Sequence, residues 1–84
     1  MTRPELQEAI LKILGGIAPE ADLTRLKPQV PLRDQLDIDS MDLLNFMIEI
    51  DRRLHVNVPE IDYPKIATLD GCVDYVAARL PGRG

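Results

Sequence analysis

The chain has 84 residues, of which 45% are hydrophobic, a composition that favours one folded domain over residues 1–84 rather than a disordered tail. Ten basic residues against 14 acidic ones leave a net charge of −4, which disfavours binding to the phosphates of nucleic acids. The N-terminus lacks the apolar core of a signal peptide and no apolar run is long enough for membrane insertion, so we expect a cytoplasmic protein.

The first predicted element is a helix over about residues 3–17. Thr2 and Glu5 have the spacing of a capping box, and Pro4 lies in the first turn, where its missing N–H costs little. Apolar residues then recur at helical spacing and form one core-facing stripe: Leu6, Ala9, Ile10, Ile13, Leu14 and Ile17.

Residues 18–38 are predicted to form a long loop, because Pro19, Pro28 and Pro31 oppose a long regular helix. A connection of this length is unusual in a small domain, and such loops are often functional. The apolar residues scattered through it are expected to anchor the loop to the core: Leu23, Leu26, Val30, Leu32, Leu36 and Ile38.

A second helix is predicted over about residues 39–54, with Asp39 or Ser40 as its N-cap. Its core-facing stripe follows the spacing of an amphipathic helix: Leu43, Phe46, Met47, Ile50 and Leu54.

A second apolar stripe of this helix consists of Met41, Leu44 and Ile48, rotated away from the first. Two interpretations are open for these residues. The long loop covers part of the stripe, or the stripe is a partner-binding patch beside Ser40.

The C-terminal part is predicted to hold a short turn or helix over about residues 61–66, interrupted by Pro64, and a last helix over about residues 68–80. Thr68 has the character of an N-cap, and Pro81 with the glycines after it should end the helix. Together the elements indicate an all-α protein with three main helices, one short third helix and a long first loop. The apolar stripe of the last helix contains Leu69, Cys72, Val73, Val76, Ala77 and Leu80.

Ser40 is surrounded by acids, and we considered first whether it is a catalytic nucleophile. Such a serine needs a base within hydrogen-bond reach, and the chain has one histidine, His55. If both lie on one helix, about 22 Å separates them at 1.5 Å per residue. We therefore expect no catalytic residue.

The acids near the serine do not form a calcium loop. Such a loop needs an oxygen ligand at position five, glycine at position six and glutamate at position twelve. Counted from Asp37, these positions hold Met41, Asp42 and Ile48, so we expect no metal site. Cys72 is expected to be a small buried hydrophobic residue rather than a reactive thiol.

Residues 36–42 read L-D-I-D-S-M-D, which resembles the L-G-x-D-S-L-D motif of acyl carrier proteins. The resemblance continues through the second helix to V-P at residues 58–59, K-I-A-T-L-D at residues 65–70 and V-D-Y-V at residues 73–76. It therefore covers nearly the whole chain, and it implies a four-helix acyl-carrier-type bundle.

The resemblance implies that Ser40 carries 4′-phosphopantetheine, with motif support from Asp37, Asp39, Met41 and Asp42. A phosphopantetheinyl transferase would transfer this group from coenzyme A. The thiol of the arm then carries an acyl group as a thioester, and the bundle can partly shelter the acyl chain. A protein of this kind is a monomeric carrier and a substrate of other enzymes, not a catalyst.

The resemblance also implies that the second helix is the main recognition element. Between residues 34 and 51 there are six acids and no Lys or Arg, which would steer basic docking patches of partners toward the serine. The expected partners are acyl-transferring, condensing or ligase enzymes. The expected partner-binding face consists of Met41, Leu44, Asn45, Ile48, Asp51 and Arg52.

Several residues depart from the carriers of fatty-acid synthesis. Asp37 replaces the motif glycine, Asn45 replaces a usual glutamate, and Arg52 and Arg53 lie where acids are usual. Fatty-acid, polyketide and other specialised acyl metabolism therefore stay open. So do a peptidyl or aminoacyl carrier and an unmodified helical interaction domain, in which Ser40 would be only a cap.

Overall fold

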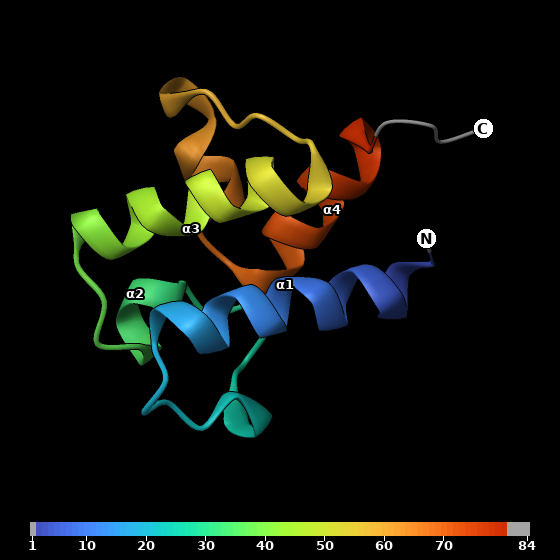
Figure 1. Ribbon diagram of the computed structural model, residues 1–84. Coiled ribbons are helices and arrows are strands. Elements are labelled where there is room, and N and C mark those ends of the chain that lie inside the picture. Colours follow the sequence, from blue (N-terminus) through green and yellow to red (C-terminus); the bar gives the residue numbers. More distant parts are fainter. Residues whose placement is uncertain (1, 81–84) are drawn as a thin grey trace.

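Four helices make up most of the computed structural model, which describes residues 2–80 (Figure 1). They are α1 (Arg3–Ile17), α2 (Leu32–Gln35), α3 (Ser40–Leu54) and α4 (Leu69–Arg79), with two 3₁₀ segments, η1 (Leu23–Arg25) and η2 (Glu60–Ile66). No strand occurs within residues 2–80, so the predicted all-α fold is confirmed, with η2 in place of the short third helix. None of these helices is long and apolar enough to span a bilayer. The predicted helix end at Pro81 and the following glycines lies outside the described residues.

Side-chain caps start α1 and α4 where the sequence predicts them. The Thr2 hydroxyl accepts from the N–H of Glu5 at 3.3 Å, and the Glu5 carboxylate accepts from the N–H of Thr2 at 3.0 Å. The Thr68 hydroxyl accepts from the N–H of Gly71 at 3.0 Å. Because a helix start leaves amides without intrahelical acceptors, these bonds stabilise the first turns and fix where the helices begin.

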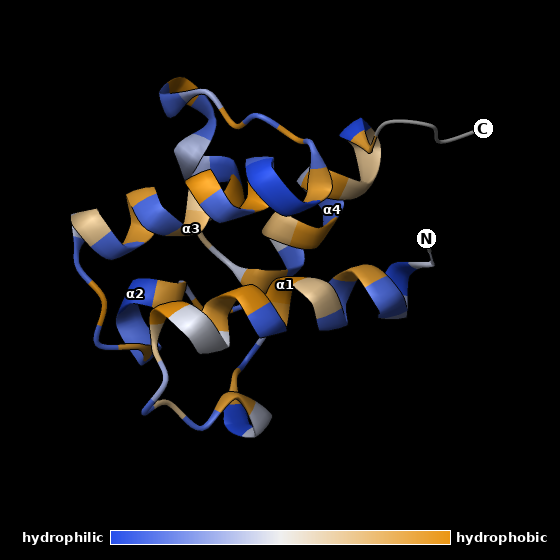
Figure 2. Ribbon diagram, in the orientation of Figure 1, coloured by the Kyte–Doolittle hydropathy of each residue, from blue (hydrophilic) through white to orange (hydrophobic). Residues whose placement is uncertain are grey.

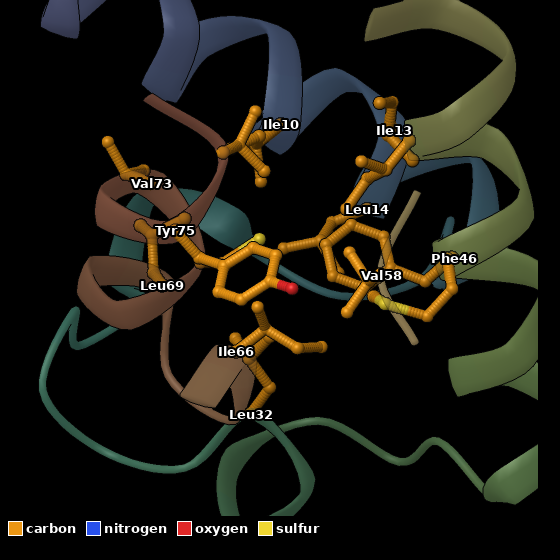
Figure 3. Close-up of a cluster of buried hydrophobic side chains, with 14 of the residues drawn as sticks. Ile10, Ile13, Leu14, Leu32, Phe46, Val58, Ile66, Leu69, Val73 and Tyr75 are labelled. Carbon is orange, nitrogen blue, oxygen red and sulfur yellow. The ribbon is translucent and has the colours of Figure 1, made fainter. Parts of the chain in front are cut away.

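The apolar stripes of α1, α3 and α4 meet in one core, and α1 contacts both of the other helices. Figure 2 shows the apolar residues along these helices, and Figure 3 shows part of the cluster around Phe46, Ile66 and Val73. Burying such side chains is the main favourable term in folding, at roughly 1.5–3 kcal/mol each. The predicted core stripe of α3 is buried at Phe46, Met47, Ile50 and Leu54 and half-buried at Leu43.

The predicted long loop over residues 18–38 contains no long helix, but it holds two short helical segments that the sequence did not predict, η1 and α2. The Asp22 carboxylate accepts from the N–H of Thr24 at 3.1 Å and starts η1. Pro31 is the N-cap of α2, with φ at −52° and an extended ψ of 134°, so it stands directly before the first helical residue. Proline opposes a helix interior but suits a helix start, so this proline begins a short helix rather than preventing one.

Backbone hydrogen bonds and buried leucines hold this first loop against the rest of the protein. Leu32 is buried, and its N–H donates to the carbonyl of Ala67 at 2.7 Å. The N–H of Asp70 donates to the carbonyl of Pro28 at 3.0 Å. The loop is thus fastened to the junction of η2 and α4. Of the predicted anchors, Leu32, Leu36 and Ile38 are buried, whereas Leu23, Leu26 and Val30 are half-buried.

Gln35 closes the loop upon itself. Its side-chain oxygen accepts from the N–H of Lys27 at 2.9 Å. Its side-chain nitrogen donates to the carbonyl of Lys27 at 2.8 Å and to that of Val30 at 2.9 Å. One side chain therefore holds the segment between η1 and α2 in a fixed path.

The segment η2 forms a 3₁₀ helix with Pro64 inside it, rather than an α-helix. It packs closely on α4, because a Cβ added at Gly71 would lie 2.5 Å from the carbonyl oxygen of Lys65. The hydroxyl of Tyr75 donates to the carboxylate of Asp62 at 2.6 Å across the same contact. Glycine at position 71 and this hydrogen bond together set the approach of η2 to α4.

Candidate functional site

Ser40 is exposed and is the first residue of α3. The preceding residue, Asp39, is the N-cap: its carboxylate accepts from the N–H of Asp42 at 2.9 Å, and the Asp42 carboxylate accepts from the N–H of Asp39 at 3.2 Å. This capping box confirms that Asp39 caps the helix. Among residues 2–80, no side chain accepts from the N–H groups of Ser40 or Met41, so both remain at the helix start for another acceptor.

The surroundings of Ser40 are acidic. Within residues 2–80, none of Asp34, Asp37, Asp39 and Asp42 forms an ion pair with a basic side chain. Asp34, Asp37 and Asp39 are exposed and Asp42 is half-buried, so these charges are available to a basic partner. The positive end of the helix dipole lies at the same place and offsets part of their mutual repulsion.

An apolar face extends from Ser40 along α3. Met41 is 65% exposed, Leu44 is 44% exposed and Ile48 is 52% exposed, so the first loop does not cover this stripe. The whole partner-binding face predicted from the sequence is exposed, and its members recur at three- and four-residue intervals on one side of the helix: Met41, Leu44, Asn45, Ile48, Asp51 and Arg52.

The end of α3 distant from Ser40 has a different charge pattern. Arg52 and Arg53 both pair with the carboxylate of Glu49, at 3.4 Å and 3.0 Å. These arginines lie in the last turn, where the helix dipole favours cations. The pairing neutralises Glu49, so the acidic field of the helix is concentrated at the Ser40 end.

The other chemically notable residues do not join this site. His55 is the C-cap of α3, at the opposite end of the helix from Ser40, with φ at 58°. Cys72 is 0% exposed in the core, and burial raises the pKa of its thiol to about 12, so the predicted inert buried cysteine is confirmed. Within residues 2–80, His, Cys, Asp and Glu form no group of three arranged to hold a metal ion.

A pocket that the sequence did not predict lies between the end of α1, the first loop and α2. Its volume is about 930 Å³, and Asp37 is among its lining residues. The small and apolar residues scattered through and beside the first loop were the available signal, but whether they face one pocket depends on the path of the loop. We call this site the loop pocket; its apolar lining consists of Ile17, Ala18, Ala21, Leu26, Val30 and Leu36.

Comparison with known proteins finds one family model and several acyl carrier proteins that resemble this chain. The family model described as "Phosphopantetheine attachment site" matches residues 5–76. The acyl carrier protein of Chlorobium phaeobacteroides is 25% identical over 79 residues, covering 94% of this chain and 100% of that protein. The acyl carrier protein of Rubrobacter xylanophilus is 29% identical over 76 residues, covering 90% and 93%. The putative mitochondrial acyl carrier protein of Schizosaccharomyces pombe is 21% identical over 76 residues, covering 90% and 68%.

The family match extends from α1 into α4, so it includes the buried core, the whole of α3 and the N-caps Asp39 and Thr68. Acyl carrier proteins are carriers rather than catalysts, and they bear the phosphopantetheine group. The chain belongs to the phosphopantetheine-attachment family, and the relatives that it resembles are acyl carrier proteins.

Proposed function

We propose that Ser40 is the residue to which 4′-phosphopantetheine is attached. The observation that carries the proposal is the position of the chain's only serine: it is exposed, within the family match, on the first turn of α3. A phosphodiester at this hydroxyl would lie beside the N–H groups of Ser40 and Met41. Helix starts favour anions for this reason, so the local geometry fits the group.

The arm supplies a thiol that carries an acyl group as a thioester. Residues of this chain contribute position rather than chemistry. Asp39 and Asp42 hold the first turn of α3 in place, which keeps Ser40 at the surface for a transferase and for the enzymes that use the loaded arm. A tethered substrate reaches each partner at a high local concentration, without a separate binding step for the acyl group.

The partners that we propose are a phosphopantetheinyl transferase and acyl-transferring, condensing or ligase enzymes with basic docking patches. Met41, Leu44 and Ile48 supply an exposed apolar centre for such contacts. The acids near Ser40 supply the steering charge, because they are not neutralised by ion pairs among residues 2–80. We expect these contacts to be weak and reversible, as repeated delivery to successive enzymes requires.

The pathway that we propose is acyl metabolism other than, or in addition to, general fatty-acid synthesis. Neutralisation of Glu49 by Arg52 and Arg53 supports this choice, because it removes negative charge from the far half of α3. A partner that needs acids along the whole helix would bind this face less well. Polyketide or another specialised acyl pathway fits a shorter acidic surface, and a cytoplasmic location remains a prediction.

The attachment site is tested by intact-mass measurement after incubation with coenzyme A, Mg²⁺ and a broad-specificity phosphopantetheinyl transferase. The wild-type chain should gain one phosphopantetheine, and Ser40→Ala should gain none while keeping its helical circular dichroism. Thr24→Ala is the matched control, because it removes an exposed hydroxyl from the first loop and should leave modification intact. Modification of Ser40→Ala would show that another residue is the acceptor.

A further inference from the structure

We propose that Arg52 determines which partners dock on α3: it favours an enzyme whose docking surface is basic near the active site and acidic about 18 Å further along the helix. The span is that of the twelve residues from Ser40 to Arg52, at about 1.5 Å each. The proposal rests on the proposed function, because such a partner acts on the arm at Ser40. It adds an acidic group to the partner, whereas the proposed function requires only basic patches.

Arg52 lies on the same side of α3 as the exposed apolar stripe. It follows Ile48 by four residues and Asn45 by seven, and residues at this spacing share one face of a helix. Its side chain is 76% exposed, so a docked partner can reach the guanidinium. Arg53 lies about 100° further round the helix axis, outside the face that carries Ile48. Of the two arginines, Arg52 is therefore the one that meets a partner.

The positive charge of Arg52 is only partly balanced. Within residues 2–80, Glu49 is the one acid that pairs with Arg52 or Arg53. Its carboxylate lies 3.0 Å from the guanidinium of Arg53 and 3.4 Å from that of Arg52. One carboxylate cannot balance two guanidinium groups, so an excess of positive charge remains. The longer contact and the greater exposure of the side chain place this excess at Arg52.

The charges at the two ends of this face act separately. The Ser40 end, where the acids lie, is about 18 Å from Arg52 along the helix, which exceeds the Debye length of about 8 Å at physiological ionic strength. Asn45, between these ends, carries no charge. Asp51 is exposed beside Arg52, but it lies about 100° round the axis, and its carboxylate accepts from the side-chain amide of Asn57 at 3.5 Å. A partner therefore meets negative charge at one end and positive charge at Arg52.

The complementary surface of a partner has three parts in a fixed order. Basic groups face the Ser40 end, apolar groups face the exposed apolar stripe, and an acidic group faces Arg52. Charges across an interface set orientation and partner choice more than affinity, and like charges placed opposite one another reject a wrong partner. A partner with this order of groups is held in one direction along α3. A partner that is basic throughout meets Arg52 with a like charge.

The first test is a charge swap with a defined probe. The probe is a broad-specificity phosphopantetheinyl transferase with a basic docking surface, together with variants in which each Lys or Arg of that surface is replaced singly by Glu. The measurement is kcat/KM for phosphopantetheine transfer, followed by intact mass. With the unaltered transferase, kcat/KM should rise a few-fold from the wild-type chain through Arg52→Gln to Arg52→Glu. With at least one Glu variant of the transferase, the order should reverse, and the wild-type chain should react several-fold faster than Arg52→Glu.

Two further variants of the chain separate this contact from general effects of charge. Lys12→Glu makes the same change of charge on the exposed surface of α1, and it should give no reversal. Glu49→Gln removes the acid that the two arginines share, so it should widen the preference for the transferase variant that gives the reversal. Added salt should shrink these differences, because they arise between exposed charges.

A second measurement locates the contact in the complex. In isotopically labelled apo protein, the side-chain Nε–H signal of Arg52 should shift when the transferase variant that gives the reversal is added without coenzyme A. The backbone amide signal of Lys12, on α1, should not shift. An unchanged Arg52 signal in a complex that forms would contradict a direct contact.

Each outcome of the charge swap bears on a different statement. An unchanged order with every transferase variant, or the same reversal with Lys12→Glu, would overturn the role of Arg52 and leave the attachment site intact. Failure of the wild-type chain to gain phosphopantetheine from the unaltered transferase would instead overturn the proposed function. If Arg52→Glu loses its helical circular dichroism, the order of the wild-type chain and Arg52→Gln decides the question.

Discussion

The stability of the first loop, which forms the wall of the loop pocket, should depend on Gln35. Replacing this residue by alanine removes all three of its hydrogen bonds. The two bonds to Lys27 are exposed and the bond to Val30 is part-buried. Hydrogen bonds of this kind contribute about 0.5–1.5 kcal/mol each, so we expect Gln35→Ala to lower the free energy of unfolding by roughly 2 kcal/mol. For a domain of this size, that corresponds to a fall in Tm of roughly 8–16 °C.

Urea denaturation measures the loss in free energy, and hydrogen exchange at the amide of Lys27 reports whether the loop has opened. Gln29→Ala is the matched control, because Gln29 is exposed in the same loop and its side chain makes no hydrogen bond within residues 2–80. The control should stay within about 0.5 kcal/mol of the wild type. Equal stability of the two variants, with unchanged exchange at Lys27, would refute the reasoning.

Three further predictions concern the core, the η2 contact and the docking face. Because Cys72 is buried and its thiol has a pKa raised to about 12, a thiol reagent should find no fast-reacting group in the folded apo protein. It should find one after phosphopantetheine is attached and two after unfolding, and a fast thiol in the folded apo form would contradict the burial. The hydrogen bond from Tyr75 lowers the pKa of Asp62 from its usual 3.8, and the same bond raises the pKa of Tyr75 from 10.0. The contribution of this contact to the free energy of unfolding should therefore be largest between pH 3.8 and pH 10.0. It should be lost as the pH falls below 3.8 through the folded pKa of Asp62, and as the pH rises above 10.0 through the folded pKa of Tyr75. Tyr75→Phe should be less stable than the wild type in urea at neutral pH and equally stable at both extremes, so a pH-independent difference would argue against the bond. Arg52→Glu should increase kcat/KM for a transferase with a basic patch by a few-fold at low salt and less at high salt, whereas Lys12→Glu, on the exposed surface of α1, is the control. A salt-independent effect, or an equal effect of both variants, would count against electrostatic steering along α3.

The sequence by itself determined where the helices begin and which of their faces are buried. Thr2, Asp39 and Thr68 cap the helices as predicted, because a cap depends on residues within one turn. Helical periodicity likewise identified the core stripes, since burial follows the three- and four-residue spacing of a helix. The motif around Ser40 could be recognised for the same reason: its residues are contiguous.

Only the tertiary structure decided what the first loop does. The prolines predicted that no long helix forms in this segment, but they did not predict the short helix after Pro31. A four-residue helix is not stable by itself and depends on tertiary contacts, such as the hydrogen bond from the N–H of Leu32 to the carbonyl of Ala67. Exposure of Met41, Leu44 and Ile48 also depended on the path of the loop, which could have covered them. The loop pocket arises from segments between Ile17 and Asp37 that touch only after folding. Periodicity and caps are local properties, whereas a pocket depends on contacts between distant residues.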